Sequence, residues 1–357
     1  MGAGLETLAR RGGNPSGSLN PQSLNSPLTS SAPNRDNIPV MPVTLDLDLL
    51  REAVSAHFQV DPDDLLLWRI PTGKFNATYM VDGADRPLIL RVAPPDDAGF
   101  VFYEKNMMAQ EPEVHSLIRS RTTVPVPEIL VYDNSRSVLD RDFLIMEKLP
   151  GRPMSDVDEL APDLYNRVLY QVGESLRQIH SIHAEQYGYL GAHHPMKPQL
   201  DWLDAFFIMW NSMIQDVVDC GYYNDSEAHI LRELLDSNLP HFNRKTPSML
   251  LHMDVWSQNI LIDEAANLTG LIDLDRALWG DPEIEFAVLD YCGISEPSFW
   301  RGYGEERDLS AEAGRRTLFY LMYEIQKYIV IRHRRQDDSR GALRYKAQTM
   351  DLADQLM

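Results

Sequence analysis

Three side chains suited to binding a hard cation follow one another within residues 250–282. Asp254 comes after an apolar run, Asn259 lies five residues further on, and Asp273 ends the second of two short apolar runs. Those two runs predict a tight hairpin, which would fold the two polar loops together. Two carboxylates and an amide oxygen at one spot suit phosphoryl transfer assisted by magnesium.

Each polar side chain of this stretch has an expected role. Asp254 is the candidate catalytic base, or the group that orients the acceptor hydroxyl. Asn259 and Asp273 are the candidate ligands of a magnesium ion that neutralises charge on the phosphate being transferred. His252 is expected to brace the loop by hydrogen bonding, and Asp275 either to support the other acids or to contact the substrate.

Composition limits the classes of protein that need to be considered. With 357 residues and an apolar fraction of 44%, the chain is long enough for two lobes with their own cores. Its 53 acidic against 33 basic residues argue against a nucleic-acid binder and against binding to an anionic membrane surface. No apolar run approaches the ~18 residues of a membrane span. Two cysteines, Cys220 and Cys292, are too few for a disulfide framework and favour a cytoplasmic location.

The chain divides into three regions by composition. Residues 1–43 are rich in Ser, Asn, Pro and Gly and predict a flexible leader, with a transit peptide as the alternative. Residues 44–150 begin with an amphipathic helix and continue with strand-like runs. Residues 151–357 are mainly helical in pattern and contain the polar stretch described above.

The polar stretch resembles a known family. HMDVWSQNILID stands where aminoglycoside phosphotransferases and choline-kinase-like proteins commonly show H-G-D-x-x-x-x-N, and LIDLDRALWGDPEIEFA resembles their second motif. The resemblance implies an α+β, bilobal, protein-kinase-like fold with a small antiparallel-sheet N-lobe and a larger, mainly helical C-lobe. It also implies that ATP and Mg are the cofactors. One departure is Met253, where the family usually has Gly, and we expect it to crowd the loop before Asp254.

The resemblance also assigns nucleotide-binding residues to the N-lobe. Gly73 and Asn76 match the family's G-x-x-N-x-[TS]-[YF] pattern, in a hairpin whose backbone N–H groups would cover the phosphates. Arg91 stands on a predicted strand where a kinase fold normally has its phosphate-binding Lys. Arg keeps the positive charge and can fork onto phosphate oxygens, although it is not equivalent to Lys.

Two further N-lobe features follow from the same resemblance. The basic strand residue needs a carboxylate partner from the next helix, which is expected to be Glu111, with Glu113 as the alternative. A buried strand breaks at Pro150, and the backbone after it, at Glu147 and Leu149, is expected to hydrogen-bond the adenine edge of ATP.

The function expected from these motifs is ATP- and Mg-dependent transfer of a phosphoryl group to a hydroxyl of a small molecule. An aminoglycoside, another amine-bearing compound and a sugar-like compound all remain open as acceptors. Seven acids could line an acceptor pocket and would then favour amines: Asp281, Glu283, Glu285, Asp290, Glu296, Glu305 and Glu306.

Two other functions stay open from the sequence. A nucleotide-binding pseudokinase is suggested by Arg91 and Met253. A metal-dependent phosphohydrolase would use a two-metal cluster built from His252, Asp254, Asp273 and Asp275.

Overall fold

The computed structural model describes residues 45–71, 75–96, 98–157 and 159–357. The predicted leader and the predicted phosphate-covering Gly73 lie outside these residues.

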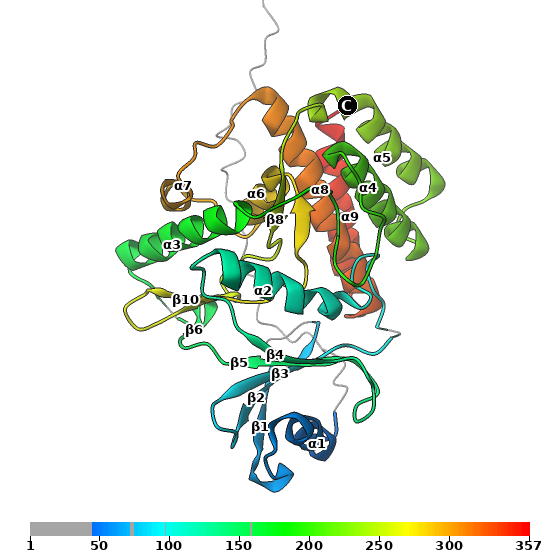
Figure 1. The fold of residues 1–357 in the computed structure, drawn as a ribbon. Helices are drawn as coiled ribbons and strands as arrows, with labels where there is room; N and C mark the ends of the chain where they lie inside the picture. The colour runs from blue at the N-terminus through cyan, green and yellow to red at the C-terminus, as the bar shows by residue number, and fades with distance from the viewer. Residues whose placement is uncertain (1–44, 72–74, 97, 158) are drawn as a thin grey trace, which may run out of the picture. The chain divides into compact units, whose positions relative to one another are not determined.

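A five-stranded antiparallel sheet forms the smaller lobe (Figure 1). Its spatial order is β1-β2-β3-β5-β4. The strands are β1 Leu66–Ile70, β2 Ala77–Asp82, β3 Leu88–Val92, β4 Ile129–Asp133 and β5 Phe143–Glu147. Antiparallel pairing of β3 with β5 sets Arg91 opposite Leu144 in the centre of the sheet.

The two faces of the sheet are covered by different helices because strand side chains alternate between faces. Phe143 and Ile145 of β5 share a buried cluster with helix α1, Leu47–Phe58, while Leu144 and Met146 lie in a separate cluster with Met108. Met108 belongs to the short η3, Met107–Gln110, which leads directly into α2, Glu111–Arg121. Pro112 lies in the first turn of α2, where its missing N–H has no helical partner to lose.

The larger lobe is mainly helical and places two small three-stranded sheets beside the helices. Its helices are α3 Pro162–His180, α4 Trp202–Asp219, α5 Asp225–Asn238, α6 Pro282–Tyr291, α7 Pro297–Tyr303, α8 Ala311–Arg334 and α9 Ser339–Asp354. One sheet has the order β10-β9-β6 and the other β11-β8-β7. Their strands are β6 Arg152–Pro153, β7 His183–Ala184, β8 Ser248–Leu251, β9 Ile260–Ile262, β10 Leu268–Leu271 and β11 Leu278–Gly280.

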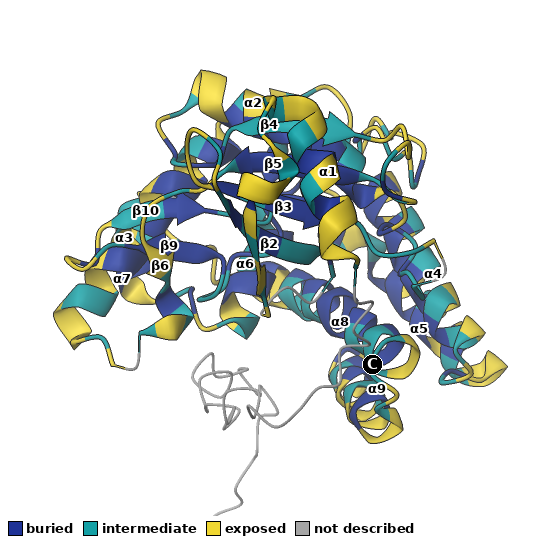
Figure 2. Ribbon diagram, turned by 90° about the horizontal axis from the view of Figure 1, so that it is seen from below, coloured by how far each residue is buried: buried dark blue, intermediate teal, exposed yellow. Residues whose placement is uncertain are grey.

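The core of the larger lobe surrounds the segment that carries the polar motifs. One buried cluster joins α3, α6 and α7 to β8, β9 and β10, and another joins α4, α5, α8 and α9. Figure 2 shows exposed residues gathered on the outer sides of the helices, whereas β3 and β5 of the five-stranded sheet are mostly buried. The predicted hairpin is β9–β10, and β8 pairs with β11, so both polar loops leave from short buried strands. Within the described ranges, no helix is both long and apolar enough to cross a membrane.

A half-buried carboxylate, that of Asp216, joins the segment after β3 to α4. The Phe102 N–H donates to Asp216 Oδ2 at 2.7 Å. Burial raises the pKa of Asp216 to about 6, although this N–H and the Arg334 guanidinium act in the opposite direction. The charged carboxylate is therefore tolerated in this contact at a cost in stability.

We expect the contribution of Asp216 to the free energy of unfolding to fall as the pH rises between about 4 and about 6, because Asp216 loses its proton there. A carboxyl group whose pKa is raised by folding stabilises the folded state below its unfolded pKa, and this contribution is lost as the pH rises. Asp216→Asn keeps an acceptor for Phe102 without a charge. The melting temperature of Asp216→Asn minus that of the wild type should increase from pH 4 to pH 7. A constant difference across this range would contradict the assignment.

Candidate active site

The loop after β8 places the candidate base beside the candidate metal ligand. Asn259 Nδ2 donates to Asp254 Oδ2 at 2.8 Å and to the Asp254 carbonyl at 2.9 Å. Asn259 is buried and Asp254 is half-buried. Because the amide N–H₂ is committed to Asp254, the Asn259 amide oxygen is the end of the side chain that can ligate a cation.

The second predicted metal ligand lies just beyond β10. Asp273 has a φ of +69°, a left-handed backbone conformation that Asp tolerates better than most residues. Its side chain is 38% exposed, and one oxygen, Oδ1, accepts from Arg91 at 2.5 Å. The residues fit magnesium, because this ion usually takes one or two protein oxygens and completes its shell with water and phosphate oxygens.

Arg91 is the centre of an ion-pair network that joins three parts of the chain. From β3 its guanidinium donates to Glu111 Oε2 at 2.5 Å and to Asp275 Oδ2 at 3.0 Å, in addition to Asp273. The Arg91 side chain is 8% exposed and the Glu111 side chain is fully buried. Asn76, from the hairpin between β1 and β2, donates to Asp275 at 3.0 Å. The structure therefore brings together β3, α2, the hairpin between β1 and β2, and the loop after β10 that carries Asp273 and Asp275.

This geometry distinguishes between the two carboxylates considered as partners of Arg91. Glu111 makes the ion pair, whereas Glu113 is exposed on the same helix. Burial acts to lower the pKa of Arg91, but the charges of its three carboxylate partners raise it above its ordinary value. Burial, together with the charge of Asp273, raises the pKa of Asp275 well above the range of a free carboxyl. Asp275 is thus a buried supporting acid, shielded by Arg91 and Asn76.

The segment after β5 is fixed by the sheet and by the β9–β10 hairpin. The Glu147 N–H donates to the Glu128 carbonyl at 3.0 Å, and its carboxylate accepts from Arg119 at 3.0 Å. Leu149 lies against Gly270, where an added Cβ would meet Leu149 Cδ1 at 2.7 Å. The Glu147 N–H donates to Glu128 and is therefore not a candidate for contact with adenine. The remaining candidates are the Glu147 carbonyl and the Leu149 N–H.

The loop before Asp254 is supported by Glu285 of α6. Its carboxylate accepts the N–H of Met253 at 2.6 Å and that of His252 at 3.3 Å, and it also contacts His180 at 2.7 Å. The expectation for the His252 side chain was wrong in detail. Both of its ring nitrogens are buried without a hydrogen-bond partner among the described residues, and the loop is braced by the His252 backbone N–H instead.

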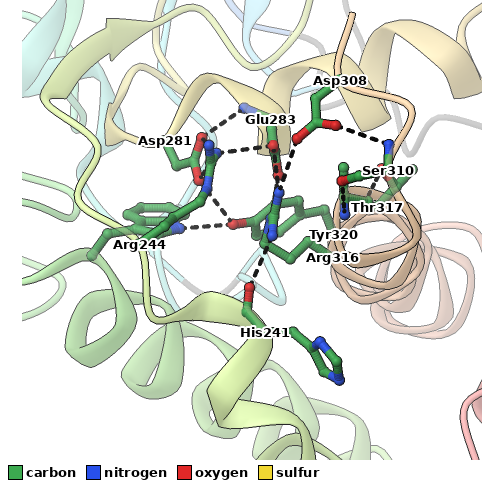
Figure 3. A network of polar contacts seen from close by, with 11 residues as sticks. His241, Arg244, Asp281, Glu283, Asp308, Ser310, Arg316, Thr317 and Tyr320 are labelled. Carbon is green, nitrogen blue, oxygen red and sulfur yellow. Dashed lines mark hydrogen bonds and ion pairs between the residues drawn. The ribbon is translucent and has the colours of Figure 1, made fainter.

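Most of the acids that suggested a cationic acceptor are already paired within the protein. Figure 3 shows Asp281 beside Arg244 and Glu283 held by Arg316, whose Nε lies 2.6 Å from the Glu283 carboxylate. The others with an ion-pair partner are Glu285 with His180, Asp290 with Arg307, and Glu305 with Arg177. Asp281 and Glu285 are also fully buried. These five acids are therefore neutralised within the helical lobe and offer little free charge to an amine.

The two-metal cluster considered for a phosphohydrolase has no counterpart in the described ranges, where no three His, Cys, Asp or Glu side chains are arranged to hold a metal ion. The reason is that its four members are used differently. The His252 ring nitrogens are buried without a hydrogen-bond partner among the described residues, and Asp275 is held by Arg91 and Asn76.

Two residues near the site were not found from the sequence. Gln110 donates from its side chain to the Asp275 carbonyl, and Arg276 donates to the Met253 carbonyl at 2.8 Å. Both contacts are to main-chain atoms far away in the sequence, and such contacts leave no spacing pattern. The one signal that could have indicated Arg276 is a charged residue in the otherwise apolar run after Asp275.

Replacing Arg91 with Ala should destabilise the protein strongly, because it leaves Glu111 buried without its cation. Removing one partner of a buried ion pair costs about 3–5 kcal/mol. We expect a loss of that size in the free energy of unfolding measured with urea, and a smaller loss for Arg91→Lys. Arg69→Ala, at an exposed strand position, is the control. Equal effects of Arg91→Ala and Arg69→Ala would contradict the role given to the network.

Comparison with known proteins places this site in a family. The model of the phosphotransferase enzyme family (APH) matches residues 68–318, more than half of the chain. A probable ketoamine kinase of Vibrio vulnificus is 26% identical over 266 residues, which cover 71% of this chain and 82% of the relative.

Solved structures agree on the fold. A candidate fructosamine-3-kinase from Thermobifida fusca has a TM-score of 0.63 and 18% identity, covering 87% of this chain and 98% of that one. A thermostable mutant of aminoglycoside phosphotransferase APH(4)-Ia, in ternary complex with AMP-PNP and hygromycin B, has a TM-score of 0.61 and 19% identity, covering 85% and 98%. The predicted kinase-like fold and the predicted family are thus confirmed: the chain belongs to the phosphotransferase enzyme family.

Proposed function

We propose that this protein is an ATP- and Mg-dependent O-phosphotransferase that acts on a hydroxyl group of a small molecule. The observation that carries the proposal is that the Ile272 N–H donates to the Asn259 carbonyl at 3.1 Å, which sets the Asp254–Asn259 pair next to Asp273 and its buried partner Arg91. Phosphoryl transfer depends mainly on positioning and on neutralising charge, and these side chains supply both.

In this proposal Asp254 takes or guides the proton of the acceptor hydroxyl. Asn259 holds one oxygen of the Asp254 carboxylate, so the other oxygen is the acceptor for that proton. The Asn259 amide oxygen and the Asp273 carboxylate would hold magnesium, which when bound neutralises charge on the phosphates of ATP.

The N-lobe residues would bind the nucleotide. Arg91 would contact phosphate oxygens while keeping its ion pair with Glu111, and Asn76 would fix the hairpin through Asp275. Gly73, outside the described residues, remains the proposed point where the backbone covers the phosphates. The Glu147 carbonyl and the Leu149 N–H are the proposed contacts to the adenine edge.

For the acceptor we propose a sugar-like compound rather than a polyamine. The internal pairing of the acids around α6 removes the reason to expect a polycation. The relative from Vibrio vulnificus is a probable ketoamine kinase, and ketoamines are sugar-derived compounds that carry several hydroxyls. We further propose a cytoplasmic location, in keeping with two cysteines that are both free.

The direct test of the reaction is ATP consumption against a panel of hydroxylated acceptors, with Asp254→Ala beside the wild type. Loss of a general base typically costs about 10²–10⁴-fold in rate, so turnover should fall by that order while nucleotide affinity is retained. Asp263→Asn, in the exposed turn of the β9–β10 hairpin, is a control expected to keep full turnover. Nucleotide binding without turnover for any acceptor would instead support the pseudokinase alternative.

The acceptor class is tested by competition within the same assay. Ketoamines and neutral sugars should raise ATP consumption in a saturable way, whereas polyamines and aminoglycosides should raise it little. Activity that saturates only with polyamines, and that weakens at high salt through screening, would reject the sugar-like acceptor.

A further inference from the structure

Met253, the residue directly before Asp254, has a backbone conformation that its side chain does not favour. Its φ is +68°, in the left-handed region where residues with a Cβ are strained. The side chain is fully buried and has no polar group with which to stabilise this conformation. Neighbouring groups must therefore hold the backbone in place.

Two buried charged side chains hold this one residue from both ends. Glu285 accepts the Met253 N–H at 2.6 Å, as described above. On the other end, Arg276 Nη1 donates to the Met253 carbonyl at 2.8 Å. Hydrogen bonds to charged groups are stronger than those between neutral groups. The carbonyl belongs to the peptide that connects Met253 to Asp254, so its direction also sets the direction of the Asp254 side chain.

Arg276 is in turn fixed by α8. Its Nη2 donates to Glu324 Oε2 at 2.7 Å, and the other oxygen of Glu324 pairs with Lys327 at 2.5 Å. The exposed fractions of these side chains are 5%, 2% and 7%, so the whole group is buried. The Arg276 guanidinium also lies 5.4 Å from the ring centre of Tyr103. The orientation of Arg276 is thus determined on three sides.

Stability alone is a weak explanation for such a group. Buried ion pairs are often replaced by apolar residues at no cost, because desolvation offsets their attraction. A fixed geometry is a better explanation here, since the group ends on the peptide next to the candidate base. Displacement of a reacting group by about 1 Å is enough to slow a reaction by about 10²-fold.

We propose that Arg276 and Glu324 are positioning residues for Asp254: through the Met253 carbonyl, helix α8 sets the orientation of the catalytic aspartate. The inference rests on the proposed function, because it assigns Asp254 the role of base. It adds a dependence of the chemical step on α8, a helix that contributes no residue to the candidate metal site.

The test compares Arg276→Lys with a matched control on α8. Lys keeps the charge but cannot fork between a carboxylate and a carbonyl. Arg316→Lys is the control, because Arg316 is equally buried and also bridges a carboxylate, Glu283, and a main-chain carbonyl, that of His241 (Figure 3). We expect kcat to fall about 10- to 100-fold in Arg276→Lys with the affinity for ATP retained, and to be unchanged in Arg316→Lys. Equal losses in both variants would overturn the proposal.

A double-mutant cycle with Met253→Gly tests the route of the effect. Glycine adopts the left-handed conformation without strain, so Arg276→Lys should cost less kcat in the Met253→Gly background. The same loss in both backgrounds would show that Arg276 acts elsewhere. Glu324→Gln keeps the shape of the group and serves where Arg276→Lys fails to fold. Glu324→Gln should also lower kcat.

Amide hydrogen exchange separates this inference from the proposed function. Arg276→Lys should raise exchange in the peptide spanning residues 250–258, and Arg316→Lys should not. If the wild type transfers phosphate to no acceptor, the proposed function fails, and exchange still decides the structural part. Unchanged exchange in residues 250–258 of Arg276→Lys would overturn the claim that Arg276 holds the Met253 backbone in place.

Discussion

One guanidinium, that of Arg91, connects the parts of this protein that the proposed reaction needs together. It lies on β3 and contacts Glu111, which is 20 residues away. It also contacts Asp273 and Asp275 in the loop after β10, more than 180 residues away. Three carboxylates around one cation leave an excess of negative charge, which is tolerable because Asp273 remains partly exposed and Asp275 is shielded by Asn76. A bound magnesium ion would neutralise the same excess, so the arrangement is suited to accept a cation.

The loop that carries Asp254 depends on a second set of buried charges. Glu285 and Arg276 hold the backbone of Met253 from opposite ends, and Asn259 holds the Asp254 side chain. Asp254 is thus fixed by Glu285 of α6, by Arg276 of the loop after β10 and by Asn259 of its own loop. In other members of the family a glycine commonly occupies the position of Met253, and the positive φ observed here gives the physical reason.

The sequence was informative wherever a role depends on local spacing. The hairpin between the two polar loops, the helix at Leu47–Phe58 and the strand carrying Arg91 follow from periodicity, and the structure contains all three. The kinase-like fold was also predictable, because two separate motifs had to match the same family. Glu111 could be favoured over Glu113 only by family spacing, and the ion pair with Arg91 decides between them.

Other features could not be predicted because they depend on contacts between distant segments. The acids of α6 looked available to a substrate, but their partners Arg244, Arg307 and Arg316 come from elsewhere in the chain. The buried group on α8 was unforeseen for the same reason. The His252 side chain was expected to form hydrogen bonds. Among the described residues its ring nitrogens have no partner, and its backbone N–H donates to Glu285 instead.

The measurement that tests the central claim most directly is a calorimetric titration of ATP, with and without magnesium, into the wild type and into Asp273→Ala. The claim is that Asn259, Asp273 and Arg91 together form a site for magnesium and nucleotide. It predicts that ATP binds the wild type more tightly with magnesium than without it, and that Asp273→Ala loses this dependence. Binding of ATP with the same affinity in all four titrations, or no binding in any of them, would contradict it.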